Sequence, residues 1–149
     1  MDTAALAVEP LAVANRLRPV LLRINRRLRR ELRDLEVTGI QISLLASIRQ
    51  HPGIGLTELA AQEEMTTASL CIHIDRLEAA GFVTRTRTEQ TDRRRVGLNA
   101  TEKGEALLET VRARRTVWLA EGLEVLDSHD LAAIDTAIEP LRRLLEARP

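Results

Sequence analysis

Hydrophobic residues recur at spacings of three and four along most of this chain, which is the pattern of amphipathic α-helices. The longest stripe predicts a helix over residues 11–35, with a kink or restart at Pro19 because proline cannot donate the helical hydrogen bond. Shorter stripes predict helices over residues 40–50, 57–64, 66–80, 102–126 and 129–147, the last with a kink at Pro140. Residues 82–88 instead alternate apolar residues or threonine with arginine, which predicts a β-strand, and with a loop over 89–94 and a return strand over 95–99 they predict a β-hairpin.

Residues at the ends of each stripe predict where the helices begin and stop. Threonine and aspartate side chains can accept a hydrogen bond from a free backbone N–H of the first helical turn. The expected N-caps are Thr38, Thr57, Thr66 or Thr67, Thr101, and Asp127 or Ser128. Gly81 is expected in the left-handed position that ends the helix over 66–80.

The same stripes predict which side chains form the core. In the middle of the chain the expected buried residues are Ile40, Leu44, Leu45, Ile48, Leu59, Ala60, Leu70, Ile74 and Leu77. The stripe over residues 11–35 is too long to be covered by so small a core, which indicates a partner helix from another subunit.

Length and composition limit the class of protein. The 149 residues suit one domain, and no apolar run approaches the roughly 18 residues of a membrane span. The N-terminus lacks the basic and apolar regions of a signal peptide, so a cytoplasmic location is expected. The single cysteine, Cys71, and three scattered histidines indicate neither a disulfide nor a metal site. With no nucleophile–base pair or phosphate loop, we expect a protein without cofactors that is not an enzyme.

The net charge of zero hides a strong asymmetry along the chain. Residues 16–33 hold eight arginines and one acid, Glu31, and residues 82–95 hold five arginines and two acids. From Ala120 onward the balance reverses, with seven acids and three arginines. Basic elements in a neutral protein favour a polyanionic partner. One phenylalanine, one tryptophan and no tyrosine argue against base stacking on single strands or RNA.

The helix over 66–80 followed by an arginine-rich hairpin is the outline of a winged helix-turn-helix. The helix is sized for the major groove of double-stranded DNA and the hairpin tip for the minor groove. We therefore predict a DNA-binding lobe over residues of about 38–100, flanked by dimerisation helices over about 11–35 and 101–147. The fold class is mainly α with a small β-hairpin wing, in a single domain.

The chain resembles the MarR (multiple-antibiotic-resistance regulator) family of bacterial transcription factors. The most specific match is the wing tip Asp92-Arg93-Arg94 followed at fixed spacing by Thr101-Glu102-Lys103-Gly104. Leu59-Ala60, Asp75-Arg76-Leu77-Glu78 and Gly81-Phe82-Val83 also fit the family pattern. The resemblance implies a homodimer on a pseudo-palindromic operator, with recognition helices in successive major grooves, and a small-molecule effector whose binding residues the sequence does not identify.

Candidate DNA-binding residues lie on the predicted helix and at the wing tip. Thr66, Thr67 and Ser69 lie near the helix N-terminus, where backbone N–H groups favour phosphate. Ile72 is placed to contact a thymine methyl group, and His73 and Arg76 to reach bases or backbone. A plain surface role for His73, and an ion pair with a neighbouring acid for Arg76, are equally good readings. By resemblance, Arg94 enters the minor groove, Arg93 lies near the phosphates, and Asp92 orients the wing arginines.

The preferred function is a sequence-specific transcriptional regulator, a homodimeric repressor released by a ligand. Two alternatives remain open: a DNA-bridging or architectural protein of low specificity, and a protein-interaction module with a vestigial DNA-binding lobe. Cys71 could sense oxidants, but it lacks a resolving partner in the sequence and is better read as an inert small hydrophobic residue.

Overall fold

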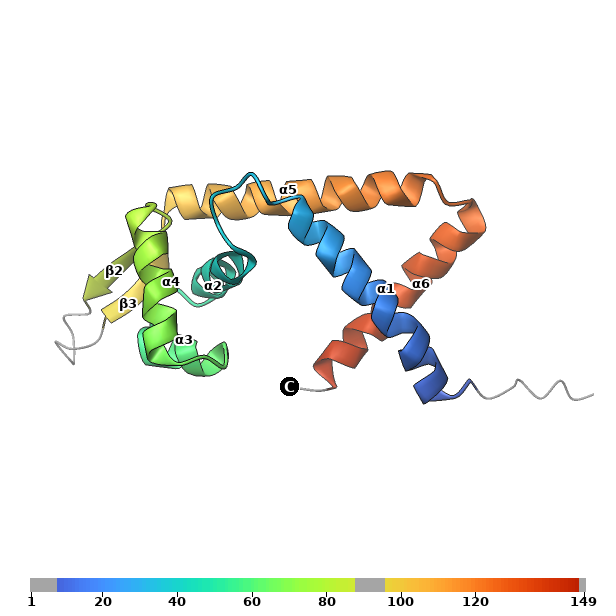
Figure 1. Ribbon diagram of the computed structural model, residues 1–149, viewed down its shortest axis with the longest axis horizontal. Helices are drawn as coiled ribbons and strands as arrows, with labels where there is room; N and C mark the ends of the chain where they lie inside the picture. The colour runs from blue at the N-terminus through green and yellow to red at the C-terminus, as the bar shows by residue number, and fades with distance from the viewer. Residues whose placement is uncertain (1–7, 88–95, 148–149) are drawn as a thin grey trace, which may run out of the picture. The chain divides into compact units, whose positions relative to one another are not determined.

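The computed structural model describes residues 8–87 and 96–147. Within them the element order is α1 (Pro10–Arg30), α2 (Gly39–Gln50), β1 (Ile54–Gly55), α3 (Leu56–Gln62), α4 (Thr67–Ala79), β2 (Val83–Arg87), β3 (Val96–Ala100), α5 (Glu102–Glu124) and α6 (Ser128–Glu146) (Figure 1). The chain divides into two compact units, Met1–Arg112 and Ala113–Pro149. This architecture confirms the predicted fold class of mainly α structure with a small β-hairpin.

The first unit contains a lobe built from α2, β1, α3, α4, β2, β3 and the start of α5. Its antiparallel sheet has the strand order β1-β3-β2, with Ile54 opposite Leu98 and Val83 opposite Ala100. The buried core joins these elements to the turn after α1 and to α5 through Leu32, Ile42, Leu44, Leu45, Ile48, Ile54, Leu59, Ala60, Leu70, Ile74, Leu77, Val83, Leu98, Leu108 and Val111.

Most of the predicted helix caps are confirmed. Thr38 and Gln41 form a reciprocal capping box at the start of α2. Thr66 accepts from the amide of Ser69 at 3.1 Å, and Asp127 accepts from the amide of Asp130 at 2.8 Å. The prediction for Thr57 was wrong, because α3 begins at Leu56 directly after β1 and its N-cap is Gly55, which has no side chain to cap with.

The first helix is shorter than predicted. It runs without interruption through Pro19 but ends at Arg30, and turns with hydrogen bonds between residues three apart follow it. Leu32 is buried there, and Leu35 packs partly buried against the same core. Leu32 and Leu35 keep the spacing of the helical apolar stripe, so the sequence predicted a helix up to residue 35 although the helix ends at Arg30.

Two further corrections concern the lobe. Ile40 was expected in the core but is 52% exposed, whereas Ile42 is buried, because the face of α2 that meets the core is centred on Gln41, Leu44, Leu45 and Ile48. The sequence also gave no sign of β1, whose two residues add a third strand beside β3. So short a strand is formed by its pairing, not by its own sequence pattern.

Two helices present apolar side chains that their own unit does not bury. No residue of α1 or of α6 is buried, and the structure describes both helices in full. Large hydrophobic residues exposed by 40% or more include Leu11, Val13, Val20, Leu21 and Leu22 on α1 and Leu131, Ile134, Ile138, Leu144 and Leu145 on α6.

Candidate nucleic-acid interface

The helix α4 has one buried face and one open face. Leu70, Ile74 and Leu77 are each 1% exposed or less, which confirms the predicted buried face. Ile72 is 54% exposed on the other side. The periodicity of the sequence therefore places α4 correctly, with its polar and apolar faces as expected.

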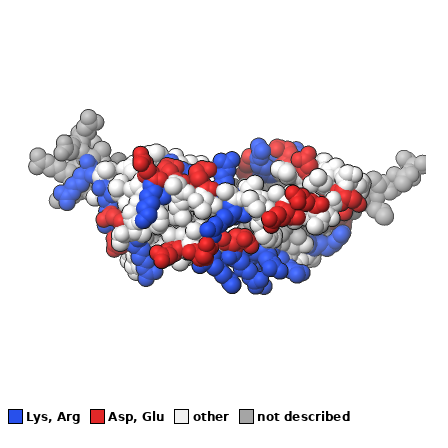
Figure 2. All heavy atoms as spheres, turned by 90° about the horizontal axis from the view of Figure 1, so that it is seen from above, with Lys and Arg blue, Asp and Glu red and all other residues white. Residues whose placement is uncertain are grey.

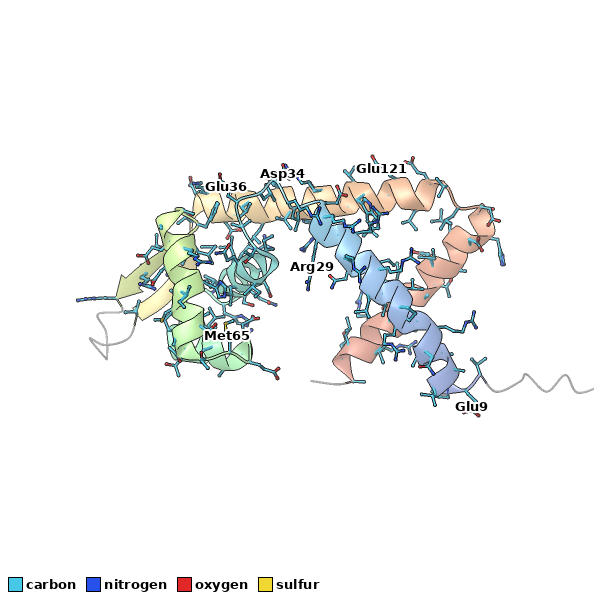
Figure 3. All side chains as sticks on the ribbon, viewed as in Figure 1. Glu9, Arg29, Asp34, Glu36, Met65 and Glu121 are labelled. Atoms are coloured by element: carbon cyan, nitrogen blue, oxygen red, sulfur yellow. The ribbon has the colours of Figure 1, made fainter. Side chains whose placement is uncertain are left out.

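The N-terminal turn of α4 carries the hydroxyl groups expected to meet phosphate. Thr66 and Thr67 are exposed and Ser69 is half-buried. The hydroxyl oxygen of Thr66 already accepts the Ser69 amide, but its hydrogen is free to be donated to an acceptor. Met65 lies in the turn that joins α3 to α4, just before this N-terminus (Figure 3).

The two remaining candidates on α4 differ in their surroundings. His73 is half-buried, and its Nδ1 atom is buried without a hydrogen-bond partner among the described residues. Arg76 is exposed. The structure shows no ion pair of Arg76 with an acid of α3 within the described ranges, so its guanidinium group is open to an outside partner.

The wing is held against α4 by an arginine that the sequence analysis did not single out. Arg85 on β2 pairs with Asp75 at 2.6 Å and with Glu78 at 3.4 Å. These two acids lie one turn apart on α4, so a single guanidinium group bridges the helix and the strand. The clue in the sequence was the alternation of arginines along the strand, but it does not tell which arginine turns toward the helix.

The end of α4 is fixed by the first turn of α5. Gly81 adopts the predicted left-handed conformation with φ of 82°. The hydroxyl group of Thr101 donates to the carbonyl oxygen of Gly81 at 2.6 Å, and Lys103 Nζ donates to that of Ala80 at 2.6 Å. Lys103 Nζ also lies 4.9 Å from the centre of the Phe82 ring. These contacts tie the end of α4 to α5.

Gly104 completes this junction because a side chain would not fit. A Cβ atom there would lie 2.3 Å from the carbonyl oxygen of Phe82. The Thr101 hydroxyl accepts the amide of Gly104 at 3.0 Å, which confirms Thr101 as the N-cap of α5. Thr101, Lys103 and Gly104 therefore join the start of α5 to the end of α4, and position 104 has no room for a side chain.

Several predicted site residues lie outside the described residues. The wing-tip residues Asp92, Arg93 and Arg94 lie outside the described residues, so their roles stay predictions. Cys71 is a free, half-buried cysteine. Within the described ranges no group of three or more His, Cys, Asp or Glu residues could hold a metal ion, and no helix is long and apolar enough to cross a membrane.

Comparison with known proteins points to one family. The family model described as the MarR family matches residues 37–96. The HTH-type transcriptional repressor MdtR of Bacillus subtilis is 30% identical over 95 residues, which is 64% of this chain and 61% of that protein. The chain therefore aligns with less than two thirds of that relative.

Solved structures agree over nearly the whole chain. A protein described as a candidate transcriptional regulator from Pseudomonas aeruginosa is 31% identical, with a TM-score of 0.79 over 91% of this chain and 94% of that one. FabT of Streptococcus pneumoniae, solved in complex with DNA, has a TM-score of 0.70 over 95% of this chain and 100% of that one. At 17% identity, FabT shows a shared fold alone.

Proposed function

This chain belongs to the MarR family and is a DNA-binding transcriptional regulator, and we propose that it acts as a homodimeric repressor that a small-molecule ligand releases from its operator. The observation that carries the proposal is the open face of α4, where Ile72 and Arg76 are exposed on a helix that is capped by Thr66 and tied to α5 at its C-terminal end. A rigid helix with an apolar group and a guanidinium group at its surface suits the major groove, where thymine methyls and base edges are read.

The wing adds a second contact in this proposal. The ion pairs of Arg85 with Asp75 and Glu78 join β2 to α4. The arginines at positions 93 and 94, by resemblance to the family, lie near the phosphates and in the minor groove, with Asp92 orienting them. A minor-groove arginine reads groove width and negative potential more than base identity. The helix would then supply sequence discrimination, and the wing would supply affinity.

The dimer is supported by the uncovered apolar faces of α1 and α6. Helices with this many exposed aliphatic residues seldom stand free in a soluble protein, because each buried aliphatic side chain stabilises by about 1.5–3 kcal/mol. A second copy of the chain offers the same faces, and a twofold axis would place two α4 helices about 10 bp apart on a pseudo-palindrome.

Repression and ligand release rest on similarity alone. The Bacillus subtilis relative is named a repressor, and we extend that role to this chain. In the proposed mechanism a ligand prefers a dimer whose two lobes are spaced wrongly for successive major grooves, so that its binding shifts the population away from DNA. The rigid junction at Lys103 and Gly104 would pass a movement of α5 to α4.

The test is fluorescence-anisotropy binding to the DNA upstream of the chain's own gene, against a scrambled duplex of equal length and composition. We expect the specific duplex to bind at least about 10³-fold more tightly at physiological salt. Equal affinity for both duplexes would refute a sequence-specific repressor and favour the architectural alternative. No binding at low salt would instead favour a protein-interaction module. Sedimentation of the free protein tests the dimer.

A further inference from the structure

The helix α1 carries a cluster of arginines that the proposed function does not use. Arg23, Arg26, Arg27 and Arg30 line a cavity of about 150 Å³, and all four side chains are exposed. Figure 2 shows blue Lys and Arg side chains gathered in one patch near the middle of the molecule, on the face that it draws. Arg29, which is labelled in Figure 3, lies near the C-terminal end of the same helix. We name Arg23, Arg26, Arg27 and Arg30 the arginine face.

The fold does not account for the arginine face. None of its four residues makes an ion pair or side-chain hydrogen bond within the part of the chain that the structure describes. Like charges three or four residues apart destabilise a helix by about 0.2–0.5 kcal/mol for each pair. The negative end of the helix dipole favours Arg27 and Arg30 in the last turn. It does not reach Arg23, which lies two turns earlier.

Three of the four residues of the arginine face, all but Arg27, also lie away from the apolar stripe of α1. Each residue of an α-helix advances by about 100°. On that basis Arg23, Arg26 and Arg30 lie about 140° around the axis from the stripe of Val13, Leu17, Val20, Leu21, Ile24 and Leu28. If a second copy covers that stripe, as the proposed dimer requires, the three arginines still point away from it. The inference therefore rests on the proposed dimer for its geometry.

We propose that the arginine face is a second DNA-binding surface, which contacts the phosphate backbone without reading sequence. The chain binds DNA, yet its net charge is zero, so the attraction must come from local basic surfaces. Arg23 to Arg30 extend over about 10 Å of helix at 1.5 Å per residue. A line of guanidinium groups suits a linear polyanion, and each group can bind a phosphate with two parallel hydrogen bonds.

The test is the salt dependence of DNA binding by the full-length variant Arg23→Gln/Arg26→Gln/Arg30→Gln. Glutamine keeps the helix propensity and part of the aliphatic stem. The matched control is Arg112→Gln/Arg142→Gln/Arg143→Gln, which removes the same charge from α5 and α6, where Arg112 and Arg142 already face Glu109 and Glu139. Each protein is titrated on a specific and a scrambled duplex over a salt series.

Three lost phosphate contacts should make the slope of log K against log[salt] shallower by about 2.7 for the arginine-face variant. When the salt concentration rises from about 50 to about 200 mM, the affinity of wild type should therefore fall by a factor about 40 times larger than the affinity of this variant. The preference for the specific duplex should be unchanged, and the control should keep the wild-type slope. An unchanged slope, or the same change in the control, would overturn the proposal.

Two further readouts separate this inference from the proposed function. A monomeric arginine-face variant in sedimentation would overturn the proposal, because the arginines would then be subunit contacts. If wild type shows no preference for its own upstream DNA, the proposed repressor function fails while the slope difference can still stand. If wild type has that preference and the slopes agree, only the arginine face is refuted.

Discussion

Replacing Gly104 by alanine should destabilise the lobe, although alanine is the better helix former. The new Cβ would lie 2.3 Å from the carbonyl oxygen of Phe82 and 3.2 Å from Leu45 Cδ1. That oxygen accepts the amide of Thr101 at 3.0 Å, so it cannot move without disturbing a hydrogen bond. Overpacking costs about 1–3 kcal/mol, and the weakened bond adds up to about 1 kcal/mol.

The gain in helix propensity offsets part of this cost. Alanine is favoured over glycine in a helix interior by about 1 kcal/mol. The net loss of unfolding free energy for Gly104→Ala is then about 0–3 kcal/mol. Gly122 in the same helix is the matched control, because its added Cβ would meet no described atom within 4 Å. Gly122→Ala should therefore be more stable than wild type, by about 0.5–1 kcal/mol.

The assay is urea unfolding followed by circular dichroism, with all three proteins at one concentration because a dimer's stability depends on it. At about 2 kcal/mol per molar urea, the midpoint of Gly104→Ala should fall by up to about 1.5 M with an unchanged slope. A Gly104→Ala midpoint equal to that of Gly122→Ala would refute the reasoning. It would mean that α5 can move away from Phe82 at no cost.

Three other substitutions test the interface. Leu77→Ala should lower the unfolding free energy by about 2–5 kcal/mol, because the side chain is 1% exposed; an unchanged melting temperature in a thermal scan would contradict its place in the core. Arg85→Gln removes ion pairs to Asp75 and Glu78 whose side chains are 64% and 43% exposed, so stability should change by less than about 1 kcal/mol. The same variant should lose DNA affinity in an anisotropy titration, and wild-type affinity would show that the bridge does not set the wing. Arg94→Ala should weaken binding to specific and scrambled duplexes alike with the fold intact, and equal affinity to wild type at moderate salt would remove the wing from the mechanism.

The sequence was sufficient for the order of the helices, most of their caps and the buried face of α4. These features depend on residues close together in the chain, such as Thr38 with Gln41 or Thr66 with Ser69, and on the 3.6-residue period that places Leu70, Ile74 and Leu77 on one side. The candidate interface followed from the same local logic, since a helix and the hairpin directly after it must be neighbours in space.

Contacts between distant residues were decided by the tertiary structure alone. The end of α1 at Arg30, the outward position of Ile40 and the strand β1 all depend on how the chain meets the core, and periodicity along one helix does not contain that information. The choice of Arg85 as the bridge to α4 depends on the strand register. The requirement for glycine at position 104 arises only where α5 meets the carbonyl oxygen of Phe82, 22 residues earlier in the chain.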